Sequence, residues 1–153
     1  MQPTDTLEST LYKWIGISMR RSMRGFIRYT KENGLSMSQI GALFHIYKGA
    51  SGVNDIAEDL DISSAAASQM LDHLVKQQLI LRSENQRDRR VKQLVLTEKG
   101  QRVLRESIQA RQSWLEDLAK DLSTSEQEQI QSALQILIDK ANQLEDQFAQ
   151  QPD

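Results

Sequence analysis

Four basic side chains lie within six residues of one another near the middle of the chain: Arg87, Arg89, Arg90 and Lys92. One acidic residue, Asp88, stands among them. A guanidinium group at the tip of a loop can enter a narrow minor groove of DNA, where the negative potential is enhanced. A neighbouring carboxylate can hold such an arginine in one rotamer. The cluster therefore predicts a contact with DNA, although a solvated charged loop has a similar composition.

The net charge of the whole chain is −2, which by itself does not favour a nucleic-acid ligand. The charge is unevenly distributed, however. Residues 73–105 hold 9 basic and 3 acidic side chains, whereas residues 106–153 hold 3 basic and 10 acidic ones. Because phosphate groups respond to the local field, the middle segment can bind DNA while the acidic C-terminal segment lies away from it.

Short elements surround the basic cluster and must position it. Apolar periodicity predicts helices over 53–60 and 64–78, joined by a tight turn at Asp61 and Ile62. Short apolar runs at 79–82 and 93–96 predict the two strands of a hairpin, with the cluster in the loop between them. This order predicts a winged helix-turn-helix, a mainly α fold with a small β-hairpin wing.

The second of these helices carries small and polar side chains opposite its apolar face. Serine and glutamine can hydrogen-bond base edges and an alanine methyl can contact a thymine methyl, whereas lysine suits a phosphate. A solvated helix face has the same composition, so both interpretations stay open for this helix alone. The predicted DNA-contacting residues of the helix and its cap are Ser63, Ser64, Ala65, Ser68, Gln69 and Lys76.

Longer helices are predicted on both sides of this region, over 6–31, 98–120 and 124–149. Their apolar stripes are longer than one DNA-reading unit needs, so we expect a second copy of the chain to bury them. The predicted organisation is an N-terminal dimerisation helix (1–35), a DNA-binding domain (36–97) and C-terminal dimerisation helices (98–153). Two-fold symmetry would then place two recognition helices about 34 Å apart, which predicts a palindromic DNA site.

Several classes of function are disfavoured by composition. The chain has no cysteine and only two histidines, so thiolate metal sites are excluded and no cofactor is expected. It lacks a recognisable nucleophile–base motif and a phosphate-binding glycine loop, so we do not expect an enzyme. The first residues do not form a signal peptide, and no apolar run approaches membrane length. A cytoplasmic protein without a membrane partner is expected.

Five stretches of sequence carry a resemblance to a known family. Asp88-x-Arg90 followed by Leu96-Thr97 fits the pattern D-x-R-x-x-x-x-x-L-T. The other stretches are IAEDLDIS (56–63), DHLVKQQLI (72–80), TEKG (97–100) and LSTSEQEQI (122–130). The sequence resembles the MarR family of bacterial regulators, whose signature is D-x-R-x-x-x-x-x-L-T, and the resemblance covers roughly residues 5–148.

The resemblance implies a homodimer joined through the first and the last two helices. It also implies that the second helix of the motif reads the major groove, that Arg90 enters the minor groove and that Asp88 orients it. Most family members are repressors, and many release DNA when a small phenolic or aromatic ligand binds. The cysteine-based peroxide response known in part of the family cannot operate in a chain without cysteine.

Ser36 and Gln39 predict a capping box that opens a second helix through Tyr47. A ligand pocket of the family type would lie between the first helix, this second helix and the start of the long helix after the wing. An apolar slot with a few polar groups would suit a small aromatic effector. Ordinary core packing explains aromatic and methionine residues at helical spacing equally well. The candidate pocket residues are Trp14, Met19, Met23, Phe26, Phe44, His45 and Arg111.

The sequence and the resemblance together predict a sequence-specific regulator of transcription that binds double-stranded DNA. It is expected to be a repressor that binds a palindromic operator as a homodimer and is released by a small aromatic or phenolic ligand. The alternative is a winged-helix protein-interaction module without specific DNA binding. Such a module would not need a basic wing tip.

Overall fold

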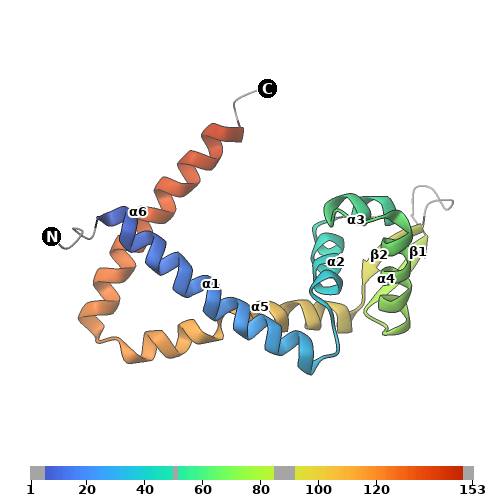
Figure 1. The fold of residues 1–153 in the computed structure, drawn as a ribbon, viewed down its shortest axis with the longest axis horizontal. Coiled ribbons are helices and arrows are strands. Elements are labelled where there is room, and N and C mark those ends of the chain that lie inside the picture. The colour runs from blue at the N-terminus through green and yellow to red at the C-terminus, as the bar shows by residue number, and fades with distance from the viewer. Residues whose placement is uncertain (1–5, 50–51, 85–91, 150–153) are drawn as a thin grey trace. The chain divides into compact units, whose positions relative to one another are not determined.

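The computed structural model describes residues 6–49, 52–84 and 92–149. Figure 1 shows the order of the elements in this part of the chain. They are α1 (Leu7–Glu32), α2 (Met37–Lys48), α3 (Val53–Asp59), α4 (Ser64–Lys76), β1 (Ile80–Glu84), β2 (Lys92–Leu96), α5 (Glu98–Asp121) and α6 (Thr124–Ala149). The chain divides into two compact units, residues 1–114 and residues 115–153, and each is described by itself below.

The predicted fold class is confirmed, because helices dominate the described residues and the only sheet among them is a two-stranded hairpin. Strands β1 and β2 are antiparallel, with Ile80 opposite Leu96 and Glu84 opposite Lys92. The strands were predicted at 79–82 and 93–96, so the hairpin extends further into the polar segment than apolar residues alone indicated. Backbone pairing does not require apolar side chains, which explains the difference.

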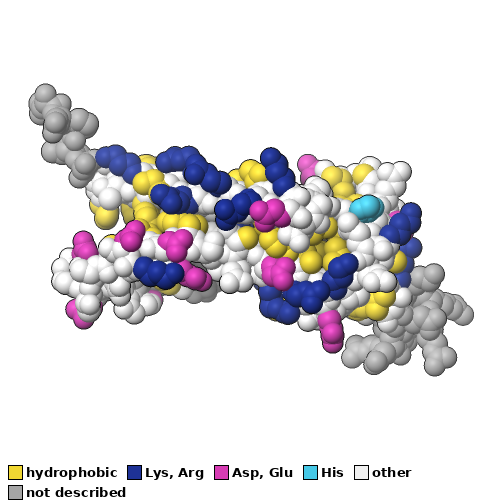
Figure 2. All heavy atoms as spheres, turned by 90° about the horizontal axis from the view of Figure 1, so that it is seen from below, with side chains coloured by type: hydrophobic (Ala, Val, Ile, Leu, Met, Phe, Trp, Pro, Cys, Tyr) yellow, Lys and Arg dark blue, Asp and Glu magenta, His cyan; other side chains and the backbone are white. Residues whose placement is uncertain are grey.

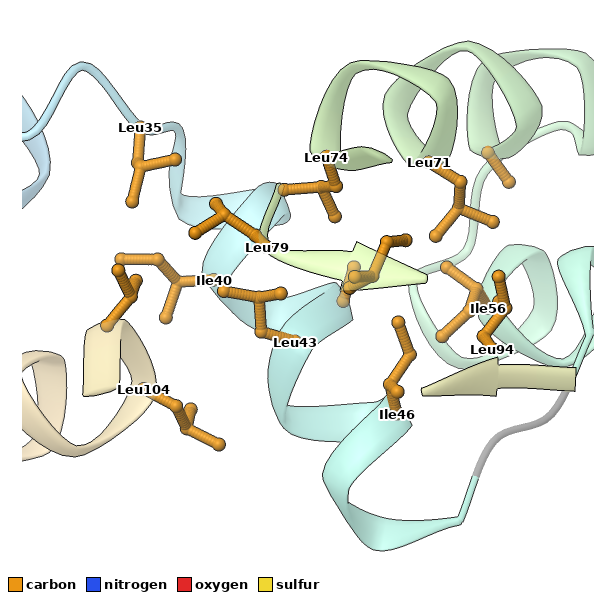
Figure 3. Close-up of a cluster of buried hydrophobic side chains, with 14 of the residues drawn as sticks. Leu35, Ile40, Leu43, Ile46, Ile56, Leu71, Leu74, Leu79, Leu94 and Leu104 are labelled. Atoms are coloured by element: carbon orange, nitrogen blue, oxygen red, sulfur yellow. The ribbon is translucent and has the colours of Figure 1, made fainter. Parts of the chain in front are cut away.

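The core of the first unit joins α2, α3, α4, the hairpin and the start of α5. Figure 3 shows leucine and isoleucine side chains from these elements converging on one another. Leu43, Ile56, Leu71 and Leu74 are fully buried. Each such side chain contributes about 1.5–3 kcal/mol through removal of its apolar surface from water. This core fixes how α4 is presented on the surface.

Helix α4 was predicted to continue to residue 78 but ends at Lys76. Gln78 adopts a left-handed conformation with φ of 60°, which cannot continue a helix. The Leu79 N–H then donates to the Leu74 carbonyl (2.9 Å) and the Gln78 N–H donates to the Val75 carbonyl (2.9 Å). These bonds satisfy the last carbonyls of the helix in the manner of a glycine cap, with glutamine in the position that glycine usually takes.

Helix α1 crosses α5 within the first unit (Figure 1). A Cβ atom added at Gly25 would collide with the Ala110 carbonyl, so glycine permits the close approach. Near this crossing the Tyr29 hydroxyl lies 3.1 Å from both the Val103 carbonyl and Glu106 Oε2. Burial and the Glu106 carboxylate raise the pKa of Tyr29 to about 12, so its phenol is a protonated donor at neutral pH.

Side-chain caps begin α2, α5 and α6. Ser36 and Gln39 form a reciprocal capping box at α2, and Thr97 Oγ1 accepts from the Gly100 N–H (3.0 Å) at the start of α5. At α6 the Ser123 N–H donates to Glu126 Oε2 (2.8 Å). Hydrogen bonds from Ser123 lower the pKa of Glu126, which keeps the cap ionised.

The unit of residues 115–153 contains the end of α5 and the whole of α6. Every α6 side chain that the structure describes is exposed. The large apolar residues among them are Ile130, Leu134, Ile136, Leu137, Ile138 and Leu144, and all of these except Ile136 recur at helical spacing. Among the described residues, none of the helices has the length and hydropathy that a membrane span requires.

Candidate nucleic-acid interface

The turn between α3 and α4 sets the angle between these helices. Asp61 occupies it with φ of 51°, and the Ile62 N–H donates to the Ala57 carbonyl (2.9 Å). Aspartate tolerates this left-handed conformation better than most residues, so the prediction of a tight turn at Asp61 is confirmed. Ala57 and Ala67 are both buried in the core, where their small side chains leave room for the helix pair.

The N-terminus of α4 is held by two serines. Ser63 is the cap, and its hydroxyl oxygen accepts from the Ala66 N–H (3.2 Å). The Ser64 hydroxyl donates to Asn54 Oδ1 of α3 (3.2 Å). Asn54 was not among the predicted site residues, because a contact between two helices leaves no local signal in the sequence. It fixes the rotamer of the first polar side chain on α4.

The outer face of α4 is almost uncharged. Ser64, Ala65, Gln69 and Lys76 are exposed, and Ser68 is half-buried. The structure therefore brings the predicted residues of this helix onto the accessible side of α4, away from the buried leucines of the core. Their short side chains would let another macromolecule approach the helix backbone closely. Figure 2 shows one face of the molecule, on which Lys and Arg side chains are exposed among hydrophobic ones.

An ion pair connects α4 with the first strand of the hairpin. Arg82 Nη2 of β1 lies 2.6 Å from Asp72 Oδ1 of α4, and both side chains are partly exposed. Helical spacing puts Asp72 on the same face of α4 as Ser68, and no local pattern in the sequence identifies Arg82 as its partner. The pair holds the strand that leads into the wing against the helix.

The tip of the wing lies outside the described residues. Arg87, Asp88, Arg89 and Arg90 fall in the segment 85–91 that the structure does not describe. Lys92 begins β2, but its side chain is not described either. The two strands on either side of the segment 85–91 are paired, and the roles of the side chains in the cluster remain predictions.

The seven candidate pocket residues occupy several places in the first unit. Met19 and Met23 line an open depression on α1. The Trp14 ring lies 5.9 Å from the Trp114 ring, between centroids. Phe26 is buried, and the Arg111 guanidinium carbon lies 3.8 Å from the centre of its ring. These contacts do not gather the residues around one cavity within this chain.

The two remaining pocket candidates lie on α2. His45 Nδ1 is 2.9 Å from Asp59 Oδ2 of α3. This histidine therefore joins two helices of the reading head, the part of the first unit that is formed by α2, α3, α4 and the hairpin. The centre of the Phe44 ring lies 5.9 Å from that of the His45 ring, in an edge-on arrangement. A structural role explains both side chains here, and their predicted role in ligand binding stays a prediction.

Two packed helices with a tight turn, followed by a hairpin, define a winged helix-turn-helix protein. Comparison with solved structures agrees with this class. YusO from Bacillus subtilis is 25% identical, with a TM-score of 0.67 over 92% of this chain and 99% of that chain. A mutant of Staphylococcus aureus MepR bound to an oligodeoxyribonucleotide is 22% identical, with a TM-score of 0.67 over 89% of this chain and 99% of MepR.

Sequence comparison finds similarity to one family. The profile of the MarR family matches residues 35–92. The transcriptional repressor MdtR of Bacillus subtilis is 28% identical over 87% of this chain and 85% of its own length. The transcriptional repressor MprA of Escherichia coli is 36% identical over 56% of this chain, and the match spans 49% of MprA. The chain is therefore similar to regulators of the MarR family, and the family match lies in residues 35–92.

The similar proteins indicate the class of activity. The relatives are regulators of transcription and not enzymes, so the prediction of a non-enzymatic protein is confirmed by the comparisons. The family match at residues 35–92 covers most of the predicted DNA-binding domain, including α4 and the first strand of the hairpin.

Proposed function

We propose that this protein is a transcriptional repressor that binds double-stranded DNA in a sequence-specific manner. The observation that carries the proposal is the accessible face of α4, which presents Ser64, Ala65, Gln69 and Lys76 beside a hairpin that bears a basic segment. A helix of this kind fits the major groove, where serine and glutamine can read base edges. The repressors MdtR and MprA support the same function.

The wing contributes the positive charge that α4 lacks. Arg87, Arg89, Arg90 and Lys92 would neutralise phosphates, and Arg90 would enter the minor groove with Asp88 fixing its rotamer. The ion pair between α4 and β1 supports this division of roles, because it ties the base of the wing to the helix that reads the major groove.

The repressor acts as a homodimer on a palindromic operator. Apolar residues along α1 and α6 support this proposal. Met19 and Met23 on α1 and Leu134 and Leu137 on α6 are all exposed in the single chain. A second copy that covers such stripes would remove them from water and hold two α4 helices at a fixed spacing. Helix α1 and helices α5 and α6 then serve dimerisation, and residues 36–97 serve DNA binding, in the cytoplasm.

A small aromatic or phenolic effector completes the proposed cycle by releasing the repressor from DNA. Trp14 supplies a ring surface, and Arg111, which lies over the buried Phe26 ring, supplies the cation that an aromatic anion requires. The candidates are dispersed within one chain, so a complete pocket of this kind would need the second copy of the protein.

Selection of bound sequences from random duplex DNA tests the proposed function. We expect enrichment of a palindrome whose half-sites are centred about one helical turn apart. Gln69→Ala should relax the preference at one position in each half-site, while Gln101→Ala, an exposed glutamine on α5, should leave the selected sequence unchanged. Failure of the wild-type protein to enrich any sequence would favour the protein-interaction alternative and reject the proposal.

A further inference from the structure

Three arginines of α1 line a depression of about 120 Å³ where this helix crosses α5. Together they form the arginine row: Arg21, Arg24 and Arg28. Gly25 and Ala110, which also line the depression, let the two helices approach closely. None of the three arginines belongs to the predicted DNA-contacting or ligand-binding residues, so the row has no role in the functions considered so far.

No carboxylate neutralises the arginine row among the residues of one chain that the structure describes. The ion pairs found there involve other side chains. All three arginines are exposed, and the Cζ atom of Arg21 lies 6.0 Å from the centre of the Trp114 ring. Like charges four residues apart on a helix, such as Arg24 and Arg28, repel one another and destabilise it. The row therefore favours an anionic partner from outside the chain.

The negative charge that would match the row is concentrated in the second unit. Residues 115–153 hold 9 acidic and 2 basic side chains, whereas residues 7–32, which form α1, hold 2 acidic and 6 basic ones. Three exposed carboxylates near the turn between α5 and α6 have no ion-pair partner among the described residues. They form the acidic corner: Glu116, Asp121 and Glu128.

The arginine row adjoins apolar surface of α1 that the proposed dimer would cover. Arg24 lines both this depression and the open depression of Met19 and Met23. A second copy that covers the two methionines would therefore reach the row as well. The depression is well below the roughly 300–1,000 Å³ of drug-sized pockets, so it suits carboxylate side chains better than a whole ligand.

We propose that the arginine row of one copy binds the acidic corner of a second copy. The inference rests on the homodimer in the proposed function and adds what selects the partner and its orientation. Carboxylates of one chain complete a cationic depression on the other, and two-fold symmetry makes this contact twice. Charge pairs of this kind act mainly on specificity, because a wrong orientation or a wrong chain would bring like charges together.

Reversing the charges on each side separately tests the pairing in the full chain. The row-reversed variant carries Arg24→Glu and Arg28→Glu, and it keeps Arg21 because of its contact with Trp114. The corner-reversed variant carries Glu116→Lys, Asp121→Lys and Glu128→Lys. Each variant alone should dimerise at least about tenfold more weakly than the wild type, because like charges then meet in both contacts.

Mixing the two variants provides the decisive measurement. In a heterodimer the reversed row meets the reversed corner and the native row meets the native corner, so both contacts again pair opposite charges. We expect the equimolar mixture to form this heterodimer with close to wild-type affinity. Sedimentation measures the affinity, and native mass spectrometry distinguishes the heterodimer from the homodimers by mass. Recovery on mixing also shows that neither variant is misfolded.

A control variant separates local pairing from net charge. Lys48→Glu with Arg105→Glu changes the charge as much as the row-reversed variant does, at exposed positions outside the row. It should dimerise like the wild type and should show no preference for the corner-reversed chain. Circular dichroism of each variant alone checks the helical content.

The possible outcomes separate this inference from the proposed function. Two variants that each dimerise like the wild type, or a mixture that does not favour the heterodimer, would overturn the pairing and leave the dimeric repressor in place. A row-reversed variant that stays dimeric but loses affinity for the selected duplex would assign the row to DNA phosphates and overturn the pairing. A wild-type chain that stays monomeric at high micromolar concentration would reject the homodimer and the pairing together.

Discussion

The reading head and α6 place their apolar side chains in opposite ways. Ile56, Leu71 and Leu74 in the head are 0% exposed, whereas Ile136 and Leu144 on α6 are 63% and 54% exposed. The head therefore completes its core within one chain, and α6 does not within its own unit. A folded DNA-reading surface and a helix that still has apolar surface to cover are what a dimeric regulator requires.

The largest predicted effect comes from charging the α6 stripe. Leu134→Glu with Leu137→Glu should abolish the dimer, because paired carboxylates cannot be buried there. The affinity for a palindromic duplex should fall by about 100-fold or more, since the two heads no longer bind as one unit. Sedimentation and a mobility-shift titration measure the two effects. Ser132→Glu with Gln135→Glu, on polar positions of α6, is the control, and a Leu134/Leu137 variant that stays dimeric contradicts the proposal.

Within the head, the next effect comes from the wing. Arg90→Ala should weaken binding to the selected duplex by about 1–3 kcal/mol at fixed salt, since a guanidinium would leave the minor groove. The fold should not change, because the core of the head is built from other elements. Arg105→Ala, an exposed arginine on α5, is the matched control. Equal affinities of the Arg90 variant and the wild type would rule out the minor-groove contact.

Tyr29→Phe tests the junction between the head and the long helices. Loss of the hydroxyl bonds to Val103 and Glu106 should lower the free energy of unfolding by about 1 kcal/mol. The ordinary tyrosine pKa of 10.0 rises to about 12 in the folded protein. The stabilisation is therefore present below pH 10 and is lost as the pH rises from 10 to about 12.

Denaturant titrations across this pH range measure the effect of Tyr29. The wild type should lose stability between about pH 10 and 12 more steeply than Tyr29→Phe does. Tyr12→Phe, at an exposed tyrosine of α1, should keep the wild-type profile. If the Tyr29 variant and the wild type lose stability in parallel, the hydroxyl contacts of Tyr29 are not the cause of the pH-dependent loss of stability.

The smallest predicted effect concerns the Asp72–Arg82 pair. Both side chains are partly exposed, so removing either should cost at most about 1 kcal/mol of stability. A double-mutant cycle with Asp72→Asn and Arg82→Gln isolates the coupling between them. A coupling of zero would show that the pair does not hold the wing to α4. Asp117 and Lys120, an exposed pair on α5 at 3.5 Å, provide the reference cycle.

Local signals in the sequence predicted much of the fold. Ser36, Thr97 and Ser123 mark helix starts through their own hydroxyl groups, and Asp61 marks the turn through its tolerance of positive φ. The end of α4 was missed because Gln78, not glycine, takes the left-handed position. No propensity distinguishes that glutamine from its neighbours.

The site was less accessible to sequence reasoning. The exposed face of α4 follows from helical spacing and was predicted. The partners Asn54 and Arg82 were not predicted. Asn54 lies ten residues from Ser64 and Arg82 lies ten residues from Asp72, and only the folded head brings the members of each pair together.

The central claim, that the head binds DNA through phosphate and groove contacts, is tested most directly by the salt dependence of affinity. The measurement is the dissociation constant of the wild-type protein for its selected duplex at several salt concentrations. Counterion release predicts a linear fall of log affinity with log salt, amounting to ~10³-fold or more between about 50 and 200 mM. An affinity that does not change with salt would contradict the account.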